Sequence, residues 1–286
     1  MYISDPEDVS KIYEDDASKV FIVTRDRQAD IYHLDLILQD NKDDGVVHHA
    51  DDITKGHLRV KEHESTILTA SFSPDGSAIS TASINGDVNF FKISFTDNCA
   101  PTCLQKWKPH ESRPVTSLFF LDDHKNSSPN AQFWRYVLTG CDYNREIKLW
   151  CCIKWQCLQT IRFTSDDDDV VPCLKAAIDF SSRFLVMSDI KRKVFLSLHS
   201  IDMFIFKFIF RKVFYVLHLL QDANDAKISS ISEYQLTCPA LCYAIVDSKT
   251  IIAKKFNRIA SSSNEENCEN ELVEYSTIQL YCIQTR

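Results

Sequence analysis

Along much of the chain, short segments in which every second residue is apolar are separated by polar turns. In two long stretches these segments and turns follow each other in the same order. The first stretch spans residues 63–91 and the second spans residues 110–150. Each begins at a histidine, continues as an alternating apolar segment, turns, and ends where an aromatic residue follows a β-branched residue by three positions. Alternation with this period predicts β-strands with one buried face. The two stretches therefore predict one structural unit, a small antiparallel sheet, that is present twice.

Turn-forming residues divide these stretches into strands. Asp75 and Gly76 follow a serine and a proline in a tight turn, since proline presets its φ and glycine tolerates positive φ. Asn85 and Gly86 form the pair that most easily takes positive φ at both central positions of a two-residue hairpin. In the second stretch, Gly140 precedes the equivalent turn. The positions that define the repeat are His63, Asp75, Gly76, Asn85, Gly86, Phe91, His110, Gly140, Asn144 and Trp150, with Tyr281 in a later partial copy.

A single small sheet of this kind cannot bury both of its faces, so neighbouring sheets must stack on it. The order of features within each unit is that of a WD40 blade, and we expect an all-β WD40 β-propeller. Residues 19–286 supply about four blade equivalents, so the ring is expected to be partial and not closed by this chain alone. Residues 1–18 are acidic and polar, and we interpret them as a disordered or truncated start.

Less regular segments connect these units. Residues 19–24 and 29–36 are predicted strands, and residues 38–61 are predicted to form a hydrophilic loop. Residues 122–130 are too polar for a strand and indicate a lengthened loop, a place where binding specificity tends to lie. The acidic run Asp166–Asp169 favours a solvated loop over a divalent-cation site, because adjacent carboxylates without spaced partners do not resemble a calcium loop.

A short sequence occurs twice in the second half of the chain, as Arg192–Phe195 and again as Arg211–Phe214. Removing one copy together with the apolar segment between them leaves a well-formed hairpin. We therefore expect an insertion near residues 195–211, of the kind that an unspliced intron would give. A membrane span over residues 195–220 is disfavoured, because each charged residue at the bilayer centre costs about 2.5–3.5 kcal/mol on insertion scales. The last partial blade is expected over residues 228–284.

Composition narrows the functional classes. A net charge of −8 disfavours a sequence-independent grip on nucleic acid, which needs a basic surface. The chain has 11 cysteines, but its first residues lack the basic and apolar regions of a signal peptide, so the thiols are expected to be reduced. Their spacing matches no zinc module. We therefore expect no metal and no cofactor.

The sequence contains no familiar catalytic motif, because Gly-x-Ser-x-Gly, a phosphate-binding loop and His-Glu-x-x-His are all missing. His63 and His110 recur at the start of each unit, where a structural hydrogen bond to Ser or Thr is the simplest role. Trp134, Arg135 and Arg145 are candidate partner-binding residues, although a Trp in a strand usually packs in the core. We therefore predict a binding protein without enzyme activity.

Residues 133–150 and 155–160 resemble the WD40 region of the enhancer-of-mRNA-decapping scaffold family, and residues 278–285 resemble the end of that region. The most specific block is Asn144–Trp150. The resemblance implies a cytoplasmic, non-catalytic scaffold that assembles decapping enzyme and decapping activator proteins in processing bodies. It also implies promotion of 5′-to-3′ mRNA decay, indirect contact with RNA, no membrane, and homo-oligomerisation through a helical C-terminal region that this chain does not contain.

Two other functions stay open. The first is a WD40 adaptor with another partner, such as a ubiquitin-ligase substrate receptor, which the lack of a Ser-rich and helical extension in the full transcript would favour. The second is direct RNA binding, which would weaken with added salt. The basic residues available for RNA are Lys106, Lys108, Arg113, Arg135 and Lys148.

Overall fold

The computed structural model describes residues 2–4, 11–15, 19–40, 47–49, 53, 55–95, 100–121, 135–164, 173–179, 181–189, 192–195, 206–209, 213–221, 225–236, 240–256 and 270–284. The predicted loop at residues 122–130 and the acidic run Asp166–Asp169 lie outside these residues.

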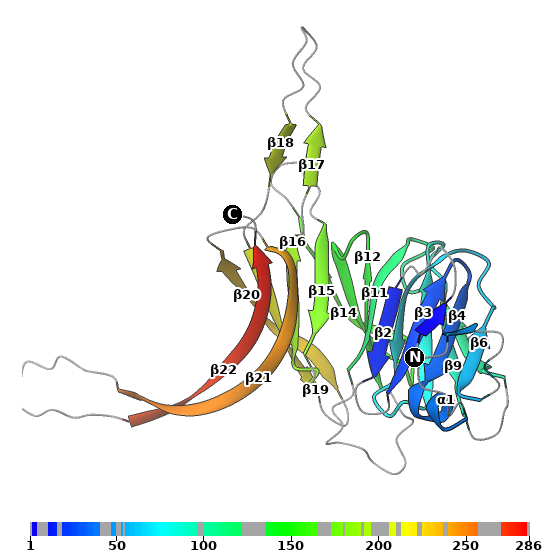
Figure 1. The fold of residues 1–286 in the computed structure, drawn as a ribbon. Coiled ribbons are helices and arrows are strands. Elements are labelled where there is room, and N and C mark those ends of the chain that lie inside the picture. Colours follow the sequence, from blue (N-terminus) through cyan, green and yellow to red (C-terminus); the bar gives the residue numbers. More distant parts are fainter. Residues whose placement is uncertain are drawn as a thin grey trace, which may run out of the picture.

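Four four-stranded antiparallel sheets follow one another along the chain (Figure 1). The first contains β2 (Lys11–Asp15), β3 (Val20–Arg25), β4 (Gln28–His33) and β6 (His57–Val60). The second contains β7 (Ile67–Phe72), β8 (Ala78–Ser83), β9 (Val88–Lys92) and β10 (Thr102–Trp107). The third contains β11 (Val115–Phe120), β12 (Tyr136–Cys141), β13 (Glu146–Cys151) and β14 (Gln156–Arg162). The fourth contains β15 (Leu174–Ile178), β16 (Phe184–Asp189), β19 (Val213–Gln221) and β20 (Ala226–Gln235).

These sheets confirm the predicted all-β fold and the four blade equivalents of a partial WD40 β-propeller. In the part of the chain that the structure describes, the most extensive contacts between sheets join neighbours in chain order. β3 of the first sheet contacts β7 of the second, and β7 contacts β11 of the third. Figure 1 shows strands of the first sheet at one side of the array and the fourth sheet at the other.

Position within a sheet explains which residues are buried. The second strands of the last three sheets, β8, β12 and β16, are buried along their whole length, because neighbouring sheets cover both of their faces. The last strands β10 and β14 alternate between exposed and partly buried positions. The alternating outer strand predicted over residues 155–163 is accordingly β14.

Hydrophobic cores lie between successive sheets. Ile22 and Phe91 belong to the core between the first and second sheets. Phe90 belongs to the core between the second and third sheets, and Leu149 and Leu217 belong to the core between the third and fourth. Because adjacent strand residues point to opposite faces, Phe90 and Phe91 fill different cores and join three sheets together.

The predicted loop over residues 38–61 is wrong in part, because β6 forms at its end and pairs with β4. Helix α1 (Leu34–Asp40) also takes the last residues of the strand predicted over 29–36. No helix in the described part of the chain is long and apolar enough to cross a membrane.

A buried ion pair accounts for the charged positions of β6, which alternate with the core residues Leu58 and Val60. Asp30 on β4 is 2% exposed and faces Arg59 across the β4–β6 pair. Arg59 Nε donates to Asp30 Oδ1, and His57 Nε2 lies 2.9 Å from the same oxygen. Burial opposes ionisation of this carboxyl, but the bonds from His57 and Arg59 outweigh burial and lower the pKa of Asp30. The charged residues of β6 are therefore partners of a buried carboxylate, which a hydropathy pattern does not reveal.

Strands also form within residues 1–18, where the sequence predicts a disordered or truncated start. β1 (Tyr2–Ser4) pairs in parallel with β5 (Val47–His49). β2 pairs with β3 and gives the first sheet its fourth strand.

β16 pairs directly with β19, although residues 190–212 separate them in the sequence. Within that segment, β17 (Arg192–Phe195) and β18 (Phe206–Ile209) form a two-stranded sheet of their own. Figure 1 shows this pair extending away from the four sheets. The fourth sheet is thus formed by strands on both sides of this segment, as expected if the segment were an insertion. The insertion near residues 195–211 stays a prediction.

A long hairpin packs against the fourth sheet. It consists of β21 (Ala240–Phe256) and β22 (Asn270–Gln284), which pair with each other. Tyr243 anchors it, because its hydroxyl lies 2.7 Å from the carbonyl oxygen of Lys175 and 2.8 Å from that of Val186.

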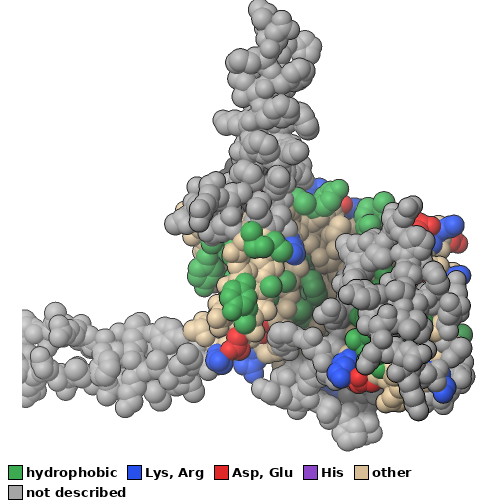
Figure 2. Space-filling view, viewed as in Figure 1, with side chains coloured by type: hydrophobic (Ala, Val, Ile, Leu, Met, Phe, Trp, Pro, Cys, Tyr) green, Lys and Arg blue, Asp and Glu red, His purple; other side chains and the backbone are tan. Residues whose placement is uncertain are grey.

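The other face of this hairpin is exposed. Tyr281 is 69% exposed and Ile283 is 64% exposed, and Figure 2 shows apolar side chains on this part of the surface. Trp150, by contrast, is 8% exposed. Tyr281 therefore does not occupy the buried place that Trp150 has in its sheet, although both residues follow a β-branched residue at the same interval.

Candidate functional site

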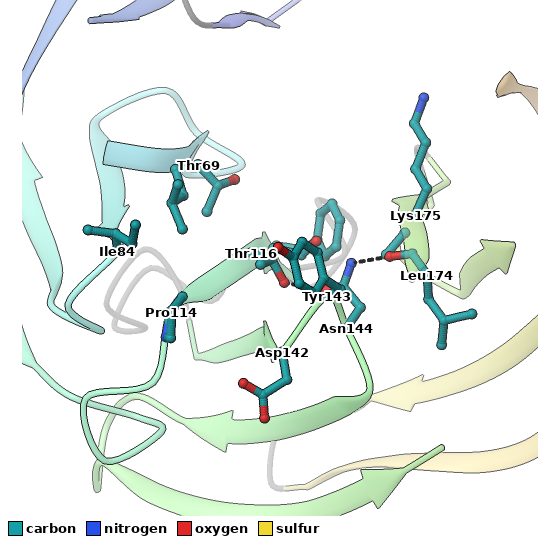
Figure 3. A pocket seen from close by; sticks show the side chains of 13 residues that line it. Thr69, Ile84, Pro114, Thr116, Asp142, Tyr143, Asn144, Leu174 and Lys175 are labelled. Atoms are coloured by element: carbon teal, nitrogen blue, oxygen red, sulfur yellow. Dashed lines mark hydrogen bonds between the residues drawn. The ribbon is translucent and has the colours of Figure 1, made fainter. Parts of the chain in front are cut away.

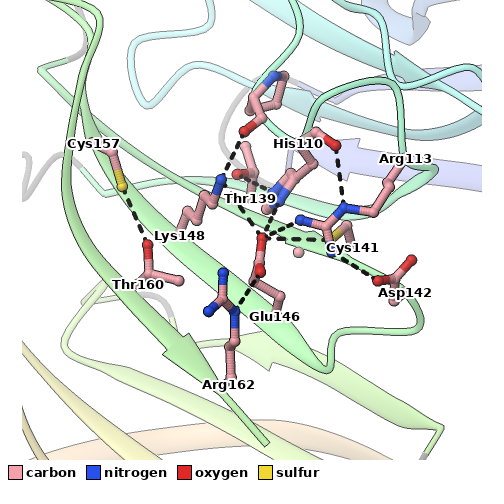
Figure 4. A network of polar contacts seen from close by, with 12 residues as sticks. His110, Arg113, Thr139, Cys141, Asp142, Glu146, Lys148, Cys157, Thr160 and Arg162 are labelled. Atoms are coloured by element: carbon pink, nitrogen blue, oxygen red, sulfur yellow. Dashed lines mark hydrogen bonds and ion pairs between the residues drawn. The ribbon is translucent and has the colours of Figure 1, made fainter.

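His110 is part of a buried chain of hydrogen bonds in the third sheet (Figure 4). His110 Nε2 lies 2.8 Å from Thr139 Oγ1 on β12, and the indole Nε1 of Trp150 on β13 donates to the same oxygen at 2.9 Å. His110 and Thr139 are both fully buried. The structural role predicted for this histidine therefore has a defined partner in the fold, the hydroxyl of Thr139.

Glu146 supplies the negative charge of this network, and the repeat pattern in the sequence does not single it out. Its Oε1 lies 3.0 Å from His110 Nδ1 and 2.6 Å from a guanidinium nitrogen of Arg113, and its Oε2 accepts from Arg162 at 2.8 Å. Lys148 Nζ lies 3.6 Å from Oε1. Burial opposes ionisation, but the bonds from Arg162, His110 and Arg113 outweigh burial and lower the pKa of Glu146 to about 2.

The protonation of His110 follows from its two neighbours. Burial is the main cause that lowers the pKa of His110, and the bond to Glu146 opposes this effect. The ring is therefore neutral near pH 7, with its proton on Nδ1, where the carboxylate of Glu146 accepts it. Nε2 then accepts the hydroxyl proton of Thr139. Each ring nitrogen already has a partner within the fold, so the imidazole is not available to a substrate.

The second sheet contains a reduced version of the same arrangement. His63 Nε2 lies 2.7 Å from Thr81 Oγ1, and Phe91 stands at the register position of Trp150, so no indole donor reaches Thr81. Asp87 stands at the position of Glu146, but it forms an ion pair with Lys108 at 3.2 Å. Among the described residues, His63 Nδ1 is buried without a hydrogen-bond partner. Burial is the main cause that lowers the pKa of His63 to about 4.

Acid should destabilise the chain through His63. Its pKa falls from 6.5 to about 4 on folding, so the unfolded chain binds the proton more readily than the folded one. The stability that the neutral ring contributes is complete above pH 6.5 and is lost as the pH falls toward 4. We expect the free energy of unfolding, measured by urea denaturation, to decrease over this window, with a smaller slope in His63→Gln. Equal slopes in the two proteins would contradict this account.

One group of described residues has the composition of a metal site. The ligand atoms of His110, Cys141 and Glu146 all lie within 4.8 Å of one another, and all three residues are buried. A metal needs the thiolate, but burial is the main cause that raises the pKa of Cys141 to about 12. The cations of Arg113 and Arg162 already bond the carboxylate. The donor set therefore fits an internal ion-pair network rather than a divalent cation.

The turn between β12 and β13 joins the third sheet to the fourth. The side chain of Asn144 is 3% exposed; its Oδ1 accepts from Thr116 Oγ1 at 3.0 Å, and its Nδ2 donates to the carbonyl oxygen of Leu174 at 2.8 Å. Leu174 N in turn donates to the carbonyl oxygen of Tyr143 at 3.0 Å. A Cβ placed on Gly140 would lie 2.1 Å from Asn144 Oδ1. Gly140 is therefore required by the side chain of Asn144 rather than by its own backbone conformation.

Gly86 has a comparable role where the second sheet meets the third. Its φ is +83°, and an added Cβ would lie 2.7 Å from Ser112 Cα and 2.8 Å from the carbonyl oxygen of Arg113. Gly86→Ala should therefore lower the free energy of unfolding by about 2 kcal/mol, since it combines left-handed strain with a backbone clash. Gly76→Ala is the matched control, because Gly76 also has a positive φ, +67°, in a turn within the second sheet. Urea denaturation should show the smaller loss for Gly76→Ala, and equal losses would argue against the clash.

A hollow of about 760 Å³ lies beside the turn between β12 and β13, along β7, β11 and β15, the first strands of the last three sheets (Figure 3). Tyr143 stands at the hollow with 60% of its surface exposed. The sequence did not indicate this residue, although an aromatic side chain in a hairpin turn has no core to pack in. The lining residues are Leu68, Thr69, Ile84, Pro114, Thr116, Ser117, Phe119, Asp142, Tyr143, Asn144, Leu174, Lys175 and Ala176.

The structure does not join the predicted partner-binding residues into one patch. Trp134 lies outside the described residues. Arg135 immediately precedes β12, whereas Arg145 lies in the turn that follows β12, so the two arginines are at opposite ends of one strand. Arg145 Nε donates to the carbonyl oxygen of Asp142 at 3.3 Å. A role for these residues in partner binding stays a prediction.

Comparison with known proteins gives a consistent family. A family profile described as the WD40 region of Ge1, enhancer of mRNA-decapping protein, matches residues 2–203. Enhancer of mRNA-decapping protein 4 of Danio rerio is 33% identical over 98% of this chain, which spans 20% of that protein. The Homo sapiens protein of the same name is 37% identical over 84% of this chain, which spans 16% of it.

Among solved structures, the crystal structure of Kluyvelomyces marxianus Hsv2 aligns with 79% of this chain and 58% of its own, at 10% identity and a TM-score of 0.46. The family assignment rests on the sequence matches, which cover most of the chain. The chain belongs to the family of the WD40 region of Ge1, the enhancer of mRNA-decapping protein.

Proposed function

We propose that this chain is part of a non-catalytic scaffold that promotes mRNA decapping and 5′-to-3′ mRNA decay in cytoplasmic processing bodies. The observation that carries the proposal is the match of 98% of the chain to a relative named enhancer of mRNA-decapping protein 4. The expected partners are decapping enzyme and decapping activator proteins, with RNA reached through them. The chain spans about a fifth of that relative, so the assembly is proposed for the complete protein.

The placement of the titratable residues supports binding rather than catalysis. Among the described residues, His110 pairs with Glu146 and His57 pairs with Asp30, and both carboxylates are buried and bonded to further residues of the fold. A general acid or base has to reach the proton it transfers in a bound substrate. The exposed ring of Tyr143 and the apolar hollow beside it do reach the surface, where they suit contact with another protein.

The charges of the third and second sheets give little support to direct RNA binding. Lys106 pairs with Glu62 at 3.0 Å and Lys108 pairs with Asp87 at 3.2 Å. Arg113 and Lys148 belong to the network around Glu146. Four of the five basic residues suggested for RNA are thus next to carboxylates, and phosphate binding needs cations that are free to displace counterions.

Affinity purification of the tagged full-length protein tests the proposed function. We expect it to recover decapping enzyme and decapping activator, and we expect cells depleted of the protein to retain capped reporter mRNA for longer. Expression of the full-length protein should restore decay, and a version without residues 19–286 should restore it less well. Recovery of ubiquitin-ligase subunits in place of decapping factors would instead favour the adaptor function.

A further inference from the structure

The turn at Tyr143 holds an aromatic ring at the surface at a cost in backbone strain. Asp142, Tyr143 and Asn144 have φ values of 51°, 57° and 62°. Asp and Asn tolerate this left-handed conformation better than other residues do, whereas it is unfavourable for a bulky residue such as Tyr143. Asn144 uses its side chain to join two sheets, which explains its own conformation. The ring of Tyr143 has no such use, since it is 60% exposed.

Hydrogen bonds fix this turn from both sides. The carbonyl oxygen of Tyr143 accepts from Leu174 N at 3.0 Å, and Asn144 bonds to Thr116 and to Leu174. The backbone of Tyr143 is therefore held in place, so the position from which its ring projects beside the hollow is fixed before a partner binds. Preorganisation of this kind is what makes an exposed aromatic residue an effective anchor for binding.

The hollow is mostly apolar and large enough for a few side chains of a partner. Ile84 and Pro114 form one part of its wall, and Phe119, Leu174 and Ala176 form others. Ile84 is itself 50% exposed. The volume of the hollow, about 760 Å³, lies in the range in which proteins bind small ligands and short peptide segments.

Two charged residues line the hollow, and they differ in their partners. Asp142 forms an ion pair with Arg113 at 2.9 Å. Lys175 Nζ lies 3.3 Å from the sulfur of Cys242 and 5.6 Å from the centre of the Tyr243 ring. Within the described residues, no carboxylate forms an ion pair with Lys175, and Figure 3 shows its side chain extending from β15 at one side of the hollow. Among the described residues, Lys175 is therefore the charged residue of the hollow that forms no ion pair, and its ammonium contacts only a thiol and an aromatic ring.

We propose that the hollow binds a short segment of a partner protein in which apolar side chains flank a single carboxylate. The apolar side chains contact Tyr143 and the wall of the hollow, and the carboxylate of an Asp or Glu pairs with Lys175. A strongly acidic partner is disfavoured by the net charge of −8, so one carboxylate in an apolar context fits better than an acidic run. The inference rests on the proposed scaffold function, and it defines the kind of peptide that this part of the scaffold recognises.

Selection from a library of random heptapeptides displayed on phage tests this assignment with the chain itself. Peptides selected on the wild-type chain should carry Asp or Glu next to Leu, Ile, Val or Phe. Lys175→Glu should weaken binding of these peptides about tenfold, the effect of 1.4 kcal/mol, and should itself select peptides with Lys or Arg at that place. Tyr143→Ala should weaken binding by a similar factor. Lys227→Glu makes the same charge change at an exposed position of β20 and should leave binding unchanged.

Three outcomes would overturn the assignment: no enrichment on the wild-type chain, enriched peptides without a carboxylate, and equal binding to Lys175→Glu. An unfolding curve of each variant controls for folding, and Lys175→Gln replaces Lys175→Glu should the reversed charge unfold the chain. The selection does not depend on decapping. Peptide binding with no recovery of decapping factors by the full-length protein would reject the proposed function alone, and the reverse result would reject the assignment of the hollow alone.

Discussion

Glu146→Ala should lower the free energy of unfolding of the chain by about 3–5 kcal/mol, the usual loss when one partner of a buried ion pair is removed. The Glu146 side chain is 5% exposed and the Lys148 side chain is 15% exposed, so neither group of this pair is well hydrated. Without the carboxylate, Lys148 loses its counter-charge and the Nδ1 of His110 loses its acceptor. Urea denaturation of the purified chain measures the difference.

Arg162→Ala is the matched control for this substitution. The Arg162 side chain is 70% exposed, so its charge is hydrated with or without Glu146, and exposed pairs contribute about 0–1 kcal/mol. The pKa of Glu146 falls from 4.5 to about 2 on folding, so its contribution is present above pH 4.5 and is lost as the pH falls toward 2. The gap between wild type and Glu146→Ala should close over the same window. A loss below 1 kcal/mol for Glu146→Ala at pH 7 would exclude the network as a source of stability.

Gly140→Ala should cost about 3 kcal/mol, because the new Cβ forces the side chain of Asn144 away from Thr116 and Leu174 and leaves buried polar groups unpaired. The distance from that Cβ to Asn144 Oδ1 would be 2.1 Å, so a small shift does not relieve the clash. The double-mutant cycle with Asn144→Ala isolates this cause. Gly140→Ala should cost much less in a chain that already carries Asn144→Ala, whereas additive losses would show that the glycine is needed for another reason.

The division into sheets follows from the sequence because its main determinants are local. A period of two residues, the pair Asn85–Gly86 and the turn at Asp75–Gly76 each specify structure within a few positions. The strand β6 was missed because it is short and its charged residue Arg59 pairs with Asp30, which is distant in sequence and adjacent in space. Tyr281 shows the opposite case. It follows a β-branched residue by three positions, as Trp150 does, but it is exposed, whereas Trp150 is buried.

The site was predictable only where a residue type recurs. His63 and His110 stand at matching places in both repeats, and a bond to a threonine hydroxyl is found at both. Glu146 was missed because its counterpart in the first repeat is Asp87, which has a different partner, Lys108. Tyr143 was not indicated by the sequence because the hollow that it lines is formed by strands far apart in the chain.

Bonds that join the first sheet to the second, and the third to the fourth, bear on the order in which the chain is expected to open. Ile67 N donates to the carbonyl oxygen of Asp26 at 2.7 Å, and Leu174 N donates to that of Tyr143 at 3.0 Å, so a hairpin turn of one sheet holds the first strand of the next. A linear array held by nearest-neighbour links unravels from its unsupported ends. Amide protons of β8 and β12, in the interior of the array, should thus exchange with deuterium last, and those of β20 should exchange early.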